Sequence, residues 1–141
     1  MNNERLTEEL LNDLLKNPKV ENFINSNSLE TPSLSENLQQ MLDKYNIKKS
    51  EVINSCNLDH THAYQIFQGT RMASRNKILQ LSFAIGCSYK DTNRLLYSAD
   101  LSTLYPKNRR DAIIIYCISN CCSLAKTNET LYQFQEDTLD D

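Results

Sequence analysis

The chain is poor in the residues that interrupt helices, because its 141 positions include only two glycines and three prolines. Such a composition predicts an all-α chain with short connections. No run of about 18 apolar residues occurs, and the start MNNERLTEELL is acidic without an apolar segment. Neither a membrane span nor a secretory signal is therefore predicted, and we expect a cytoplasmic protein with no membrane partner.

Motifs for catalysis and metal binding are also missing. The sequence holds no glycine-rich phosphate loop, no HExxH and no histidine set beside a cysteine nucleophile, so we do not expect an enzyme. None of the five cysteines forms a CxxC pair, and the histidines His60 and His62 are distant from Cys117 and Cys121, so no metal or cofactor is expected. Free, mostly buried thiols are predicted, with a redox sensor at Cys121 and Cys122 as the alternative.

The most informative stretch, residues 56–86, has the spacing of a turn followed by two helices. Asn57 stands in the turn where a left-handed backbone is expected, and Asp59 is a natural N-cap for the helix that follows, Asp59–Gln68. The apolar residues of this helix fall three and four positions apart, at Ala63, Ile66 and Phe67. The pattern predicts a helix-turn-helix whose second helix lies in the major groove of double-stranded DNA.

Apolar spacing and capping residues predict seven helices from Leu34 onward and no β-strand of consequence. The predicted helices are Leu34–Tyr45, Lys49–Ser55, Asp59–Gln68, Ser74–Ile85, Lys90–Ala99, Asn108–Asn120 and Ser123–Phe134. A sheet within residues 34–99 would exclude the helix-turn-helix interpretation.

The segments YQIFQGTRMASRNKILQL and LYPKNRRDAIII, with the acidic N-terminal segment, make nearly the whole chain similar to a bacterial subfamily of phage-repressor-like (XRE-type) helix-turn-helix regulators. This resemblance implies a five-helix DNA-reading core over residues 34–99, a helical extension over residues 100–141, and a role as a transcriptional regulator. Two residues depart from the general pattern: Ile53 replaces a small residue, and Asn57 replaces glycine. We expect the bulkier Ile53 to widen the angle between the two motif helices.

Charge is divided unevenly along the chain, although the net charge is only −3. Residues 44–110 carry eleven basic and four acidic side chains, a net of +7, whereas residues 1–43 and 111–141 each carry a net of −5. The basic segment coincides with the helix-turn-helix pattern, which favours nucleic acid as the partner. The alternative is that helical surfaces simply carry Lys and Arg.

Two groups of side chains are the candidate DNA contacts. The candidates for base edges are His60, Thr61, Tyr64 and Gln65. Among these the amide of Gln65 is suited to adenine, and the absence of arginine from this helix makes guanine an improbable target. The candidate phosphate contacts are Lys48, Lys49, Gln68, Arg71, Arg75 and Lys77.

The C-terminal extension has an apolar band from Ala112 to Ile118 that is too broad for a one-faced surface helix. We expect it to cover the core as an intramolecular lid, with the seam of a homodimer as the alternative. Arg109 and Arg110, beside Asp111, are either phosphate contacts or members of an internal ion pair.

Residues 1–33 form an acidic arm with short helices, and residues 25–35 are predicted to be a linker. Its leucine patch consists of Leu10, Leu11, Leu14 and Leu15. This patch either packs on the core or offers a short helix to a protein partner, and the arm's acidity also suits it to cover the basic segment in competition with DNA.

An alternative function belongs to a different class. The chain would then be a protein-interaction adapter, or a target of a Ser/Thr kinase at Thr31, Ser33 or Ser35, that keeps a helix-turn-helix fold without binding DNA. The acidic net charge favours the adapter, and the basic middle segment favours the regulator.

Overall fold

The computed structural model describes residues 7–17, 19–26 and 32–140, and in these ranges every regular element is an α-helix. The prediction of an all-α fold is confirmed. The chain divides into two units, Met1–Thr31 and Pro32–Asp141. In the first unit, α1 (Thr7–Lys16) packs against α2 (Val20–Ser26). None of the described helices is long and apolar enough to cross a bilayer.

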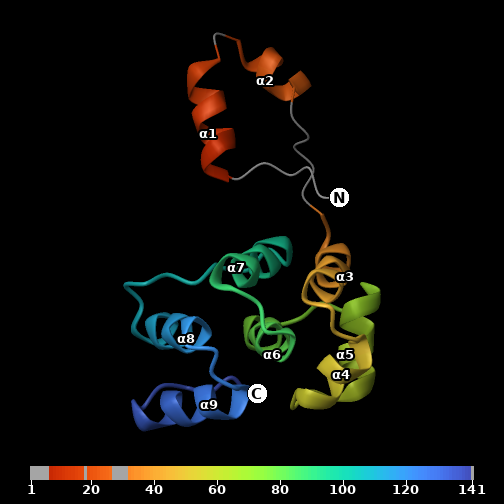
Figure 1. Cartoon of the computed structure of the whole chain (residues 1–141), viewed down its shortest axis with the longest axis vertical. Helices are drawn as coiled ribbons and strands as arrows, with labels where there is room; N and C mark the ends of the chain where they lie inside the picture. The colour runs from red at the N-terminus through yellow and green to blue at the C-terminus, as the bar shows by residue number, and fades with distance from the viewer. Residues whose placement is uncertain (1–6, 18, 27–31, 141) are drawn as a thin grey trace. The chain divides into compact units, whose positions relative to one another are not determined.

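The second unit contains seven helices among its described residues (Figure 1). They are α3 (Leu34–Tyr45), α4 (Lys49–Ser55), α5 (His60–Gln68), α6 (Arg75–Ile85), α7 (Tyr89–Ser98), α8 (Arg109–Ser119) and α9 (Leu124–Gln133). All seven predicted helices are found, and no bound moves by more than one residue.

Polar caps begin most of these helices. The capping oxygens, each accepting the backbone N–H three residues later, belong to Ser33, Asp59, Ser74, Ser88, Asn108 and Ser123. Such caps satisfy backbone donors that the first helical turn leaves unpaired. At the other end, α5 stops at Gly69, whose φ of 82° is readily reached by glycine alone.

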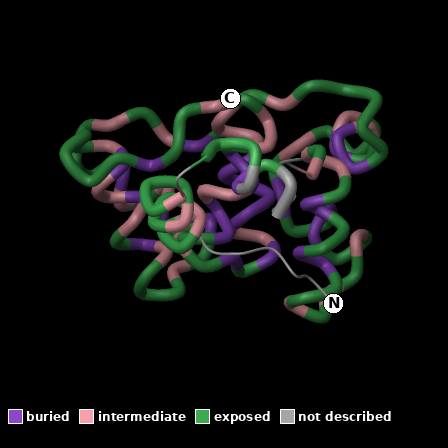
Figure 2. The backbone as a smooth tube through the Cα atoms, turned by 90° about the horizontal axis from the view of Figure 1, so that it is seen from above, coloured by how far each residue is buried: buried purple, intermediate pink, exposed green. Residues whose placement is uncertain are grey.

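One apolar core joins the predicted helix-turn-helix segment to the C-terminal helices. In Figure 1, α6 lies centrally, with α3, α4 and α5 to one side and α8 and α9 to the other. The core cluster draws on every helix of this unit, through Leu38, Ile53, Ile66, Leu79, Leu95, Ile114 and Leu131. Figure 2 shows the buried backbone segments toward the interior and the exposed segments around them. The extension thus covers the core within one chain, as a lid would, and a homodimer stays a prediction.

Candidate nucleic-acid interface

Helix α5 divides its side chains between the core and solvent. Its buried residues are Ala63, Ile66 and Phe67, as the apolar spacing predicted. His60, Thr61, Tyr64 and Gln68 are exposed, and Gln65 is half-buried. All four predicted base contacts therefore keep accessible surface on one short helix.

The first turn of α5 is fixed by a carboxylate. Asp59 accepts the His62 N–H at 3.0 Å, which caps the helix and also places a negative charge at its start. His62 is half-buried, and its Nε2 has no hydrogen-bond partner within the described ranges. This histidine faces the packed side of α5 more than the exposed side.

Arg71 lies in the loop after α5 and reaches back to that helix. Its Nη1 donates to Gln65 Oε1 at 3.4 Å, a long contact between two side chains. The next residue, Met72, is 89% exposed. Arg71, a predicted phosphate contact, therefore lies next to Gln65, the predicted adenine contact, in an exposed part of the loop.

Lys48 and Lys49 stand at the start of α4. Lys48 is exposed and occupies the N-cap position without a side-chain cap hydrogen bond. The Nζ atom of Lys49 lies 5.6 Å from the centroid of the Phe67 ring, which brings the start of α4 beside the end of α5. Lys77, in the first turn of α6, is half-buried.

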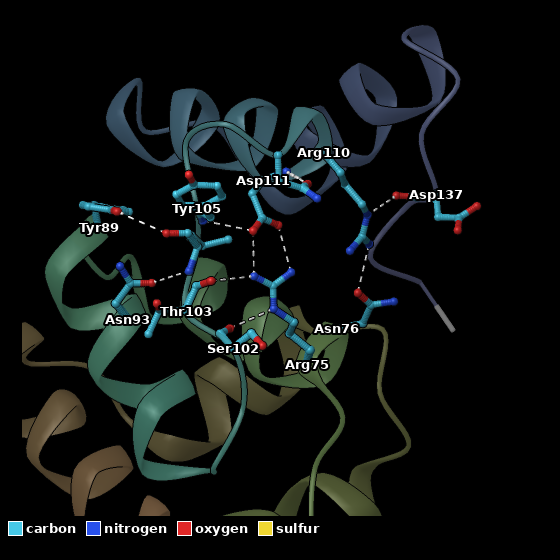
Figure 3. A network of polar contacts seen from close by, with 12 residues as sticks. Arg75, Asn76, Tyr89, Asn93, Ser102, Thr103, Tyr105, Arg110, Asp111 and Asp137 are labelled. Carbon is cyan, nitrogen blue, oxygen red and sulfur yellow. Dashed lines mark hydrogen bonds and ion pairs between the residues drawn. The ribbon is translucent and has the colours of Figure 1, made fainter.

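Arg75, predicted to hold a phosphate, lies instead in an internal clamp (Figure 3). Its guanidinium forms a two-point ion pair with Asp111, at 2.8 and 2.9 Å. It also donates to the Ser102 and Thr103 carbonyls, at 2.9 and 3.0 Å. Because these contacts use its donors, Arg75 is removed from the proposed interface and assigned to the join between the core and the extension.

The carboxyl of Asp111 is held in its charged form. Burial acts to raise its pKa, but hydrogen bonds from Arg75 and the Tyr105 N–H, together with the positive charges of Arg75 and Arg110, outweigh burial and hold that pKa below its usual 3.8. The Asp111 N–H in turn donates to Asn108 Oδ1 at 3.0 Å. One carboxylate therefore ties the start of α8 to α6 and to the loop between α7 and α8.

Arg109 and Arg110 both bond the C-terminal segment, and Arg109, whose side chain is 66% exposed, also pairs with Glu136 at 3.8 Å, so that a phosphate contact by either arginine stays a prediction. Arg110 donates to the carbonyls of Asp137 and Thr138 and to Asn76 Oδ1, each at 2.9 Å. Arg109 donates to the Phe134 carbonyl at 3.0 Å. Both arginines hold the C-terminal segment, and the ion-pair partner of Asp111 is Arg75.

Internal pairing lowers the basic excess of the middle segment. Arg75 forms an ion pair with Asp111 and Lys44 forms one with Asp91 at 2.7 Å, whereas the hydrogen bonds of Arg110 go to neutral carbonyl and amide oxygens. Outside these pairs, the accessible cations of α4, the loop after α5 and the first turn of α6 are Lys48, Lys49, Arg71 and Lys77. The candidate interface therefore consists of these four cations and the four polar side chains of α5.

The turn between α4 and α5 depends on a residue that the sequence pattern did not reveal. Gln80, buried on α6, accepts the Asn57 N–H at 3.3 Å and donates to the Leu139 carbonyl at 2.7 Å. Cys56 Sγ donates to the Gln80 carbonyl at 3.8 Å. Asn57 is not among the described residues with positive φ, so the prediction of a left-handed backbone at this position is wrong. These contacts close the turn, and a lone polar residue between Leu79 and Leu81 was the available signal.

The candidate kinase sites differ in accessibility. Ser33 is exposed but its oxygen caps α3, and Ser35 Oγ donates to the Phe67 carbonyl at 2.6 Å. Thr31 lies outside the described residues. The two candidate serines therefore contribute to the folded core through their hydroxyl groups.

The cysteines are free thiols, as predicted. Cys56, Cys87 and Cys117 are buried, Cys122 is half-buried and Cys121 is exposed. Burial raises the pKa of Cys56 to about 11 and that of Cys87 to about 12. Within the described ranges no three His, Cys, Asp or Glu side chains gather as metal ligands would.

No family model, curated protein or solved structure matches the chain. Membership of the XRE-type regulators therefore stays a prediction from the sequence.

Proposed function

We propose that this chain is a sequence-specific, double-stranded-DNA-binding transcriptional regulator of the XRE type that reads the major groove with α5. The division of α5 carries this proposal. Its apolar side is buried in the core, whereas its other side offers hydroxyl, imidazole, phenol and amide groups that can bond base edges. A cytoplasmic location accompanies this function.

Each accessible residue has a defined role in the proposed complex. Gln65 is the adenine reader, because an amide can bond N6 and N7 of adenine together, and His60, Thr61 and Tyr64 contact neighbouring base edges. The residues assigned to phosphates are Lys48, Lys49, Gln68, Arg71 and Lys77. The long contact between Arg71 and Gln65 supports a loop that grips the backbone beside the base that Gln65 reads.

Selection from a random-sequence duplex library, followed by salt titration of the selected duplex, tests the proposal. We expect one sequence to be enriched and the logarithm of its affinity to fall with the logarithm of salt, with a slope of roughly −3 to −4 for four cations. Failure to enrich any sequence, together with salt-independent or absent binding, would overturn the proposal.

One observation favours the adapter as a second candidate function. On α1 and α2 the exposed large apolar side chains are Leu11, Leu14, Leu15, Val20 and Ile24. A helix with such a face is suited to an apolar groove in a protein partner. An adapter would enrich no duplex in the selection, whereas substitution of Leu11 and Leu15 by polar residues would abolish its capture of a protein partner.

A further inference from the structure

We propose that the C-terminal tail, residues 136–140, positions the turn before α5 through Gln80, so that the orientation of the reading helix depends on the far end of the chain. Asn57 in the turn and Asp140 in the tail are 83 positions apart, yet one buried amide bonds both segments. The consequence for DNA reading rests on the proposed function, whereas the link between tail and turn does not.

The tail is fixed to the rest of the unit along its length. Arg110 donates to the carbonyls of Asp137 and Thr138, and Asn128 Oδ1 accepts the Leu139 N–H at 2.7 Å. The side chain of Leu139 is fully buried in the core cluster. A single register of the tail is therefore selected by both polar and apolar contacts.

Gln80 transmits that register to the turn. Its Nε2 donates to the Leu139 carbonyl at 2.7 Å and its Oε1 accepts the Asn57 N–H at 3.3 Å. A buried amide that loses one partner must turn or remain unpaired, and either outcome is costly. Moving the tail therefore disturbs the hydrogen bond to Asn57, although Asn57 and the tail are far apart in sequence.

A second contact joins the same two segments at the surface. Asn57 Nδ2 donates to Asp140 Oδ1 at 3.0 Å. Asn57 stands two residues before Asp59, whose carboxylate caps α5. The direction in which α5 leaves the turn is therefore set by residues bonded to the tail, which makes Gln80 and Leu139 positioning residues for the proposed reading helix.

The test compares Asn128→Ala with Gln133→Ala in the full-length chain. Both positions lie on α9, but Asn128 holds the Leu139 N–H, whereas Gln133 is exposed. Hydrogen exchange of the Asn57 and Leu58 amides is measured first, without DNA. Affinities are then measured for the duplex that the wild type selects and for a random-sequence duplex. Gln80→Met, which removes both amide contacts and leaves the tail sequence unchanged, is the second variant.

In Asn128→Ala we expect the Asn57 amide to exchange faster than in the wild type. The affinity for the selected duplex, divided by the affinity for the random-sequence duplex, should fall roughly two- to thirtyfold, which is the range for coupling through packed side chains. Affinity for the random duplex should be retained, which general unfolding would not allow. Gln80→Met should show the same faster exchange and lower affinity ratio, and Gln133→Ala should match the wild type in both.

Exchange at Asn57 that is equal in Asn128→Ala and Gln133→Ala would overturn the link between tail and turn. Faster exchange with an unchanged affinity ratio would overturn the positioning of α5. If the wild type binds no duplex at all, the proposed function is overturned. The exchange rates at Asn57 then still support or overturn the link between tail and turn, because they are measured without DNA.

Discussion

Arg75 and Asp111 face each other where the core meets the C-terminal extension, with two N–H···O contacts of 2.8 and 2.9 Å. The side chain of Asp111 is 7% exposed and that of Arg75 is 24% exposed. Removing one partner from such a pair leaves the other charge buried without compensation. The pair therefore stabilises the attachment of α8 rather than an interface with DNA.

Replacing Asp111 with Asn tests this role. We expect the free energy of unfolding to fall by about 2–4 kcal/mol, somewhat below the range for fully buried pairs because Arg75 retains some solvent contact. Urea denaturation of both proteins gives the difference. Glu129→Gln is the matched control, because its ion pair with Lys126 is exposed and should contribute less than about 1 kcal/mol. Equal losses of unfolding free energy in the two variants would contradict a stabilising role for the ion pair between Arg75 and Asp111.

Acid should weaken the attachment of α3 to α7. Asp91 accepts hydrogen bonds from Lys44 at 2.7 Å and from the Tyr45 hydroxyl at 2.6 Å. Burial acts to raise the pKa of Asp91, but these bonds and the positive charges of Lys44 and Arg94 together outweigh burial and hold that pKa below its usual 3.8. A carboxyl whose pKa is lower in the folded state stabilises the fold above its unfolded pKa, and this contribution is lost as pH falls through the folded pKa.

Urea denaturation between about pH 6 and pH 2 measures this effect. Wild type should lose more unfolding free energy than Asp91→Asn as pH falls below 3.8, because the amide has no such proton to bind. Parallel pH profiles for the two proteins would show that Asp91 contributes nothing specific in acid.

Arg71 and Gln65 should be separable by their effects on binding. Arg71→Ala is expected to weaken binding to all duplexes alike and to shrink the salt slope by about one unit. Gln65→Ala should cost about 1–3 kcal/mol at one base position only. Lys90→Ala, an exposed lysine on α7, is the control and should alter neither quantity. Equal losses from Gln65→Ala on selected and random duplexes would remove Gln65 from the base contacts.

The acidic N-terminal unit should restrain DNA binding. Residues 1–31 hold six acidic and three basic side chains, and a deletion that ends at Thr31 keeps Ser33, the cap of α3. We expect the remaining residues to fold and to bind DNA a few-fold more tightly. The gain should be largest at low salt, since such forces are screened over about 8 Å at physiological ionic strength. Circular dichroism and binding at two salt concentrations measure both effects, and an affinity unchanged at low salt would exclude this role.

The cysteines should differ sharply in reactivity. Only the thiolate reacts with a disulfide reagent, and burial raises the pKa of Cys56 to about 11 and that of Cys87 to about 12. At neutral pH we expect rapid reaction at exposed Cys121, and reaction at Cys56 and Cys87 only on unfolding. Colorimetric thiol titration follows the kinetics. In Cys121→Ser the rapid phase should shrink, and a rapid phase of undiminished amplitude would refute this assignment.

Helix positions were predictable from sequence because the signals are local. Asp59 and Ser74 cap the helices they precede, and the apolar residues of α5 repeat with the helical period, so the buried and exposed sides of α5 followed directly. The accessible base-edge candidates share this local origin, because a helix face is a property of a few consecutive residues.

Partners distant in sequence were not predictable in this way. The role of Arg75 depends on Asp111, and the conformation at Asn57 depends on Gln80 and, through it, on Leu139. No periodicity relates such residues, because tertiary packing alone brings them together. A lone polar residue within an apolar helical run, like Gln80, indicates a buried hydrogen bond without naming its partner.

The burial of Leu139 has a practical consequence for handling the protein. A purification tag or fluorescent domain fused after Asp141 would begin three positions after a leucine that has no exposed surface. It would also begin two positions after Asp140, which accepts a hydrogen bond from Asn57 at 3.0 Å. A fusion at that end would therefore act on the contacts that hold the turn before α5.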